Sequence, residues 1–112
     1  MSRGDQASLL DILQAVHRIA QFKGRLGRAP FLNDAKTQSS VLHQLLVIGE
    51  ASKRLSPGFR AKHHGIPWRE IAGMRDKLIH AYDVIDLEEV WDTITKDLPR
   101  LAKAIRPLAP KR

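Results

Sequence analysis

Apolar residues recur at helical spacing along the whole chain, and no segment alternates in the manner of a half-buried strand. The clearest run lies near the C-terminus, where large apolar residues follow one another by four and three positions: Leu87, Trp91, Ile94, Leu98, Leu101 and Ile105. Such spacing lines one face of a helix, as in the seam of a helical bundle. The pattern predicts an all-α fold.

Four helices with mostly short connections are expected, which gives an antiparallel four-helix bundle that could include a fifth short helix. The first helix is predicted to begin near Ser8, with Asp11 as a capping partner, and to be stopped by Gly24 and Gly27. The second spans residues 34–55. Two adjacent apolar stripes on this helix predict two buried faces, so it lies centrally or contributes to a dimer.

The third helix is predicted to start at Pro67, since proline suits the first helical position, and to end near residue 83. Asp86 is a candidate cap for the fourth helix, with Glu89 completing a D-x-x-E box. Pro99 is expected to interrupt this helix because it lacks the backbone N–H group. The loop between the second and third helices is predicted to be irregular and basic.

Residues 1–112 are interpreted as a single domain, with a disordered tail over residues 106–112. The sequence has no cysteine, which excludes disulfides, thiolate metal sites and a cysteine nucleophile, and fits a reducing cytoplasm. No apolar run approaches the roughly 20 residues needed to span a bilayer. No metal site and no cofactor are predicted, since the adjacent pair His63-His64 has no third ligand nearby. Neither a phosphate-binding glycine loop nor a paired-carboxylate motif is present, which argues against a nucleotidyltransferase role for this chain.

The formal charge of +7 favours a polyanionic partner, either nucleic acid or an acidic protein surface. Basic residues are concentrated over residues 53–69 and at the C-terminus. Only 5% of residues are aromatic, which argues against RNA-binding folds that stack bases on aromatic platforms.

One short segment, R-D-K-L-I-H-A-Y, brings chemically useful residues together: Arg75, His80 and Tyr82. Arginine offers a planar, permanently charged fork for phosphate oxygens. Histidine titrates near neutral pH and can take the proton from a ribose 2′-hydroxyl, which then attacks the adjacent phosphate. Spacing alone is weak evidence, since a surface arginine and an unrelated histidine often lie five positions apart, and Tyr82 could simply pack.

The helical spacing also sets a geometric condition on this segment. Five positions correspond to about 140° around an ideal helix, so Arg75 and His80 of one helix do not converge. Either the helix distorts near its end, or the arginine side chain wraps around it, or residues of two subunits meet across a dimer interface.

Several stretches resemble the HepT-like branch of the HEPN superfamily, in the right order and over about residues 11–105. They are D-I-L-Q-A-V-H-R-I, K-T-Q-S-S-V-L-H-Q-L-L-V-I-G-E-A-S-K-R-L, I-P-W-R-E-I-A-G-M-R-D-K-L-I-H-A-Y-D-V-I-D-L-E-E-V-W and D-L-P-R-L. The resemblance implies a helical homodimer that acts as a metal-independent ribonuclease toxin. It implies an antitoxin partner, a minimal nucleotidyltransferase (MNT type), that silences the toxin by AMP transfer to tyrosine.

Carried over to this sequence, the resemblance makes Arg75 and His80 catalytic and Tyr82 the AMPylation site, with RNA as substrate. Asp76 departs from the small polar residue, usually asparagine, that follows the arginine in this branch, so it could orient the site or weaken RNA binding. Glu50, in I-G-E-A, is a candidate supporting residue or an ordinary exposed helix residue.

Two other functions remain open from the sequence. The chain could be a non-catalytic helical module that binds a minimal nucleotidyltransferase or a nucleotide. It could also be a helical dimer that only scaffolds a complex.

Overall fold

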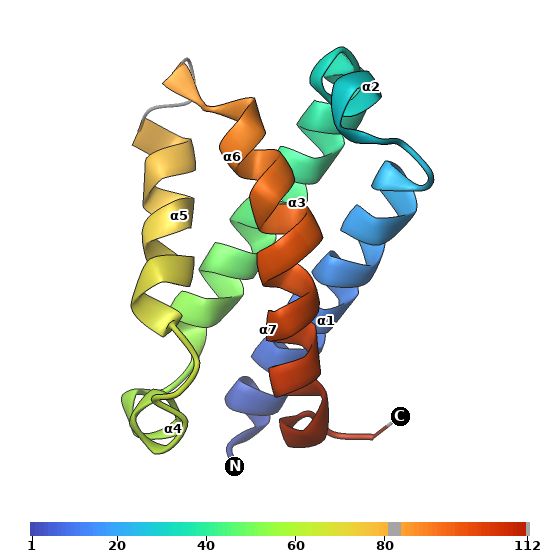
Figure 1. The fold of residues 1–112 in the computed structure, drawn as a ribbon. Helices are drawn as coiled ribbons and strands as arrows, with labels where there is room; N and C mark the ends of the chain where they lie inside the picture. The colour runs from blue at the N-terminus through green and yellow to red at the C-terminus, as the bar shows by residue number, and fades with distance from the viewer. Residues whose placement is uncertain (81–83, 112) are drawn as a thin grey trace.

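The computed structural model describes residues 1–80 and 84–111, and within these ranges all the regular secondary structure is helical (Figure 1). Seven α-helices follow one another along the described chain: α1 (Arg3–Lys23), α2 (Arg28–Leu32), α3 (Ala35–Arg54), α4 (Pro57–Lys62), α5 (Trp68–His80), α6 (Leu87–Asp92) and α7 (Leu98–Ile105). A π-helical turn, Thr93–Asp97, joins α6 to α7. The prediction of an all-α bundle is confirmed.

Helix α3 is the centre of the bundle, with α1 packed on one side and α5 on the other. Helices α6 and α7 form one continuous rod that lies across α3 and contacts α1 (Figure 1). The four long rods are therefore α1, α3, α5 and α6–α7, and α2 and α4 are short connecting helices. This is the predicted four-helix arrangement.

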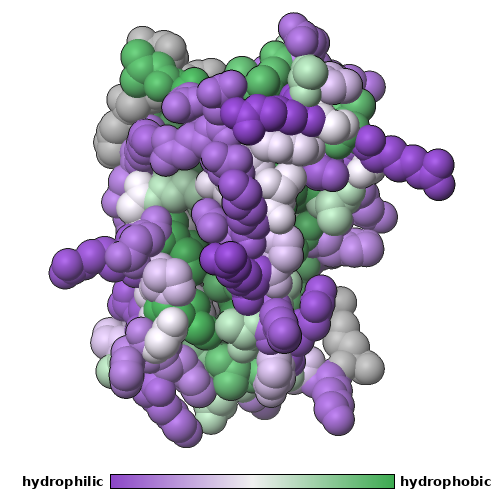
Figure 2. Space-filling model, in the orientation of Figure 1, coloured by the Kyte–Doolittle hydropathy of each residue, from purple (hydrophilic) through white to green (hydrophobic). Residues whose placement is uncertain are grey.

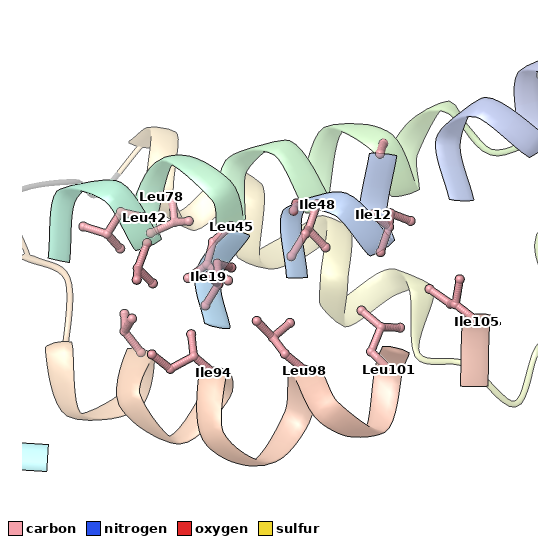
Figure 3. Packing of buried hydrophobic residues seen from close by; sticks show 14 of the residues in the cluster. Ile12, Ile19, Leu42, Leu45, Ile48, Leu78, Ile94, Leu98, Leu101 and Ile105 are labelled. Carbon is pink, nitrogen blue, oxygen red and sulfur yellow. The ribbon is translucent and has the colours of Figure 1, made fainter. Parts of the chain in front are cut away.

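Aliphatic side chains from all four rods form one core (Figure 3). Leu45 and Ile48 of α3 face Ile94 and Leu98 of the α6–α7 rod, and Leu78 joins them from α5. All five are at least nine-tenths buried. Burial of such side chains is the main favourable term in folding, so the core fixes how α5 lies against α3.

Helix α1 begins earlier than predicted. Ser2 caps the helix by accepting a hydrogen bond from the Asp5 backbone N–H at 3.0 Å, whereas Ser8 is buried inside it. The predicted capping role of Ser8 and Asp11 is wrong, because Ser8 faces the core. The stop at Gly24 is confirmed, since its φ of 52° is a conformation that favours glycine.

The connection between the second and third predicted helices also differs from expectation. Ser56 accepts a hydrogen bond from the Phe59 backbone N–H at 3.2 Å and so caps α4, a short helix where a loop was predicted. Phe59 is buried and packs against Trp68 at the start of α5, with 6.1 Å between ring centroids. An aromatic contact therefore orders this connection, and it could not be seen from local sequence.

The starts of the other long helices agree closely with the prediction, and the predicted end of the third helix near residue 83 lies outside the described residues. Asp34 caps α3 through the Thr37 backbone N–H, at 3.1 Å. Asp86 caps α6 by accepting from the Glu88 and Glu89 backbone N–H groups. The Glu89 carboxylate pairs instead with Lys77 of α5 at 3.1 Å, so α6 has the cap without the reciprocal half of the box.

The predicted interruption at Pro99 takes the form of the π-helical turn just before it. The Leu98 backbone N–H bonds to the Thr93 carbonyl, five residues back, which widens the helix where the proline ring would otherwise clash. After this turn α7 resumes and buries Leu98, Leu101 and Ile105. The predicted apolar face of this helix therefore continues past Pro99.

The expectation of a disordered tail over residues 106–112 is wrong for the described part of this segment. Arg106–Leu108 form a 3-10 turn, and Leu108 and Ala109 are partly buried against the core. Arg112 lies outside the described residues. Two apolar side chains are thus enough to hold the end of the chain against the bundle.

A buried carboxylate ties the start of α1 to the start of α4. Asp5 is 4% exposed and accepts hydrogen bonds from the Ser56 backbone N–H and hydroxyl, each at 2.7 Å. The Ser56 backbone hydrogen bond is the largest cause that lowers the pKa of the Asp5 carboxyl below its usual value. Asp5 is therefore ionised at neutral pH, as its two donors require.

The Asp5→Asn substitution is expected to destabilise the fold by about 1–3 kcal/mol at pH 7, because an amide replaces one of the two acceptors. The folded pKa is depressed, so the ionised carboxylate stabilises the fold above the unfolded value of about 4. That contribution is lost as the pH falls through the folded pKa. Thermal unfolding at several pH values should show the difference shrinking in acid; exposed Asp97→Asn is the control.

Hydrophilic side chains cover most of the face seen in Figure 2. Apolar atoms are visible among them in the region where α5 lies beside the α6–α7 rod. Of the helices within residues 1–80 and 84–111, none combines the length and the apolar character needed to cross a membrane.

Candidate functional site

The site predicted from R-x-x-x-x-H begins at Arg75, which lies where α5 approaches α3 most closely. Gly49 of α3 faces the backbone of Arg75: an added Cβ at Gly49 would overlap the Arg75 Cβ and lie 3.0 Å from Cγ and 3.2 Å from Cα. Only glycine permits this approach. The glycine of I-G-E-A therefore sets the position of Arg75 against α3.

Two carboxylates hold the Arg75 guanidinium group. Glu50 of α3 places Oε1 2.5 Å from Nε, and Asp76 places Oδ1 3.0 Å from Nη1. The Nε–H is buried and does not point along its contact with Glu50, so that contact is an ion pair without a well-directed hydrogen bond. The side chain of Arg75 is 24% exposed, and its partners are more open to solvent.

Lys53, also on α3, was predicted only as a member of the basic segment 53–69, and the structure brings it to the site. Its Nζ lies 2.9 Å from Asp76 Oδ1, the same oxygen that pairs with Arg75. Lys53 lies four positions after Gly49, so the two share one side of α3. Given the contact between Gly49 and Arg75, this spacing would place Lys53 near the site as well.

The hydrogen bond from Lys53, followed by that from Arg75, holds the pKa of the Asp76 carboxyl below its usual range. Asp76 is therefore an anion at neutral pH. The four side chains, two cations and two carboxylates, sum to no net charge. In this arrangement Arg75 is ordered, but its charge is already balanced.

His80 is the last residue of α5, so an α-helical backbone joins it to Arg75. The structure does not describe its side chain, and the predicted role of Tyr82 lies outside the described residues. The structure thus brings Arg75, Glu50 and Asp76 together and adds Gly49 and Lys53 to them. The convergence of Arg75 and His80 stays a prediction.

The basic segment before α5 is held by its own contacts. The His63 ring lies 4.6 Å from Phe59 between centroids, and its carbonyl accepts a hydrogen bond from Trp68 Nε1 at 3.0 Å. Within residues 1–80 and 84–111, no three histidine, aspartate or glutamate side chains are grouped in a way that could hold a metal ion.

A groove of about 490 Å³ runs on another side of α5, between it and the α6–α7 rod. Its floor is apolar, with Ile71 and Met74 among the lining residues, and Glu70, Asp97 and Arg100 also line it. Arg75 does not line this groove. The predicted catalytic arginine and the groove are therefore separate features.

The helical bundle, with R-x-x-x-x-H on its third long rod, agrees with the fold expected from the HEPN-type resemblance. The family described as ribonuclease HepT-like matches residues 12–108, and the chain belongs to that family. Family membership confirms the resemblance seen in the sequence and the expected class of enzyme, a ribonuclease.

Individual relatives agree with this assignment. The protein named "Probable ribonuclease HepT" of Thermococcus cleftensis is 45% identical over 101 residues, which cover 90% of this chain and 92% of that protein. Two further relatives are named "Putative RNase". The one from Caldanaerobacter subterraneus is 43% identical over 72% of this chain and 72% of its own length. The one from Methanocaldococcus jannaschii is 40% identical over 92% of this chain and 85% of its own length. No solved structure gives a significant match.

Proposed function

We propose that this chain is a metal-independent RNA endonuclease, acting in the cytoplasm as the toxin of a HEPN/MNT toxin–antitoxin pair. The observation that carries the proposal is membership of the ribonuclease HepT-like family over residues 12–108, with R-x-x-x-x-H on an ordered helix. The net charge of +7 supports a polyanionic substrate.

Arg75 is the phosphate-binding residue in this proposal. Its guanidinium group is fixed between α3 and α5, so little side-chain entropy remains to be lost when a phosphate binds. A fixed positive fork can stabilise the charge that develops on the phosphate oxygens as the bond breaks. Glu50 supports the site by holding Nε.

His80 is the general base. It takes the proton from a ribose 2′-hydroxyl, whose oxygen attacks the adjacent phosphorus while the 5′-oxygen of the next nucleotide leaves. The leaving oxygen takes up a proton from water, and His80 later returns its own proton to solvent. The products are a 2′,3′-cyclic phosphate and a 5′-hydroxyl end. No metal ion is needed, because Arg75 supplies the positive charge and His80 moves the proton.

A homodimer is part of the proposal, because five helical positions separate Arg75 from His80 and a second copy could complete the site. Ile79, on α5 between the two catalytic residues and 45% exposed, supports an apolar contact at this place. Leu46 and Val47 of α3 are also only partly buried. Burial against a second copy would also help a domain of this size.

The first test is cleavage of single-stranded RNA by the purified chain, freed of bound partner, in buffer containing EDTA. The proposal expects cleavage, which should be lost in Arg75→Ala. Failure of the folded chain to cleave any RNA would contradict it.

AMP transfer to Tyr82 is the proposed means of silencing. The phenolic oxygen would attack the α-phosphorus of ATP and release pyrophosphate, in a reaction catalysed by the nucleotidyltransferase partner. Tyr82 is the sole tyrosine of the sequence, so tyrosine-linked AMP has one possible position. Co-expression with such a partner should add one or more AMP groups to the intact mass, and Tyr82→Phe should prevent this; unchanged mass with an active partner would contradict the proposal.

One observation favours the non-catalytic alternative, a module that binds a nucleotidyltransferase or a nucleotide. Glu50 and Asp76 already balance the charges of Arg75 and Lys53, which would weaken their attraction for RNA. The cleavage test separates the two functions, because a non-catalytic module would bind its partner and leave RNA intact.

A further inference from the structure

One carboxylate oxygen of Asp76 is shared between two helices. Oδ1 lies 2.9 Å from Lys53 Nζ on α3 and 3.0 Å from Arg75 Nη1 on α5. Two cations from different helices thus converge on one anionic oxygen. The same arrangement would suit an oxygen of a phosphodiester, which also accepts charge-assisted hydrogen bonds from lysine and arginine.

The contacts on the two sides of Arg75 differ in kind. Glu50 holds the buried Nε, whereas Asp76 contacts the terminal Nη1. An anion that replaced Asp76 at Nη1 would leave the contact with Glu50 in place. The arginine would therefore keep its position while it changed partner.

The shared contact is also open to solvent. The side chains of Lys53 and Asp76 are 40% and 48% exposed. Ion pairs in this setting are weak because water and salt screen them. Exchange of Asp76 for another anion at these two cations is therefore accessible.

We propose that Lys53 is a second phosphate-binding residue of the site, and that Asp76 is the internal anion which an RNA phosphate displaces from Lys53 and Arg75. The inference rests on the proposed RNA cleavage. In this inference Asp76 keeps Lys53 and Arg75 ordered in the free protein and competes with RNA for them.

The test is equilibrium binding of a fluorescent single-stranded RNA of mixed sequence, fully 2′-O-methylated so that it cannot be cleaved through the 2′-hydroxyl. Binding is measured over a series of salt concentrations. Lys53→Gln should weaken binding roughly three- to tenfold and reduce the slope of log K against log salt by about one. Lys53→Arg should restore both, since it restores the cation.

Arg54→Gln is the matched control. Arg54 is the next residue of α3, and its substitution removes the same charge, but its partner is Asp11 of α1, at 3.3 Å. Its effect on affinity and slope should be smaller than that of Lys53→Gln. Asp76→Asn should tighten binding, and the gain should shrink when Lys53→Gln is also present, because one of the two released cations is then missing. Thermal unfolding of each variant checks the fold.

Equal effects of Lys53→Gln and Arg54→Gln would overturn the inference, as would weaker binding by Asp76→Asn. If wild-type chain cleaves unmodified RNA while either result is found, the proposed function stands without this inference. If the Lys53 effect is found but unmodified RNA stays intact, the inference stands and the catalytic proposal fails. Absence of any RNA binding by wild-type chain would overturn both.

Discussion

The His80→Ala protein is expected to cleave RNA about 10²- to 10⁴-fold more slowly than the wild-type chain, the range over which a positioned general base acts. Without the imidazole, no group of the motif accepts the 2′-hydroxyl proton, although Arg75 can still bind the phosphate. The substitution should therefore lower the rate at saturating RNA much more than it lowers the affinity for RNA. Single-turnover cleavage kinetics measure both quantities.

The control is His17→Ala, which removes an exposed histidine from α1, on the other side of α3 from α5. Its cleavage rate should match that of the wild-type chain. Thermal unfolding should show both variants folded. A folded His80→Ala protein with an undiminished rate would remove His80 from the catalytic role and leave the general base unidentified.

The Gly49→Ala protein is expected to lose about 1–3 kcal/mol of the free energy of unfolding, the usual effect of overpacking a close contact. The added methyl group would overlap Arg75 Cβ, which belongs to the base of the side chain and cannot swing away. Helices α3 and α5 must separate instead. Because Arg75 then moves relative to Glu50 and Lys53, cleavage should fall by more than the loss of stability explains.

Gly73→Ala is the matched control, since Gly73 lies within α5 and an added Cβ would meet no atom within 4 Å. This substitution should stabilise the chain by up to about 1 kcal/mol, because alanine favours the helix. Urea unfolding measures both variants. Equal stability of Gly49→Ala and Gly73→Ala would show that the two helices adjust freely at Arg75.

The long helices could be predicted because their information is local. The cap Asp86 and the stop at Gly24 act within one turn of the chain, so their residue types identify them. The start of α1 was misplaced because Ser8 has the residue type of a cap, and its burial depends on the rest of the bundle. Helix α4 was missed because a contact between Phe59 and Trp68 helps to order it.

The candidate site likewise contains some residues that the sequence identifies and others that only the structure shows. Arg75 could be named from one short motif, and Asp76 and Glu50 from the resemblance. That Lys53 reaches Asp76, and that Gly49 faces Arg75, depends on the register of α3 against α5, which no local pattern contains. The sequence left open whether Asp76 orients the site or weakens RNA binding. The structure shows that Asp76 pairs with both Lys53 and Arg75.

In the proposed reaction, Arg75 and His80 cut RNA through the ribose 2′-hydroxyl without metal. Its most direct measurement is the chemistry of the ends produced in EDTA by wild-type chain from one RNA, and from the same RNA with a single 2′-deoxynucleotide at the cut position. We expect 2′,3′-cyclic phosphate and 5′-hydroxyl ends from the first RNA and no cut at the substituted position of the second. Cleavage that needs a divalent metal ion, or that continues at the 2′-deoxynucleotide, would contradict it.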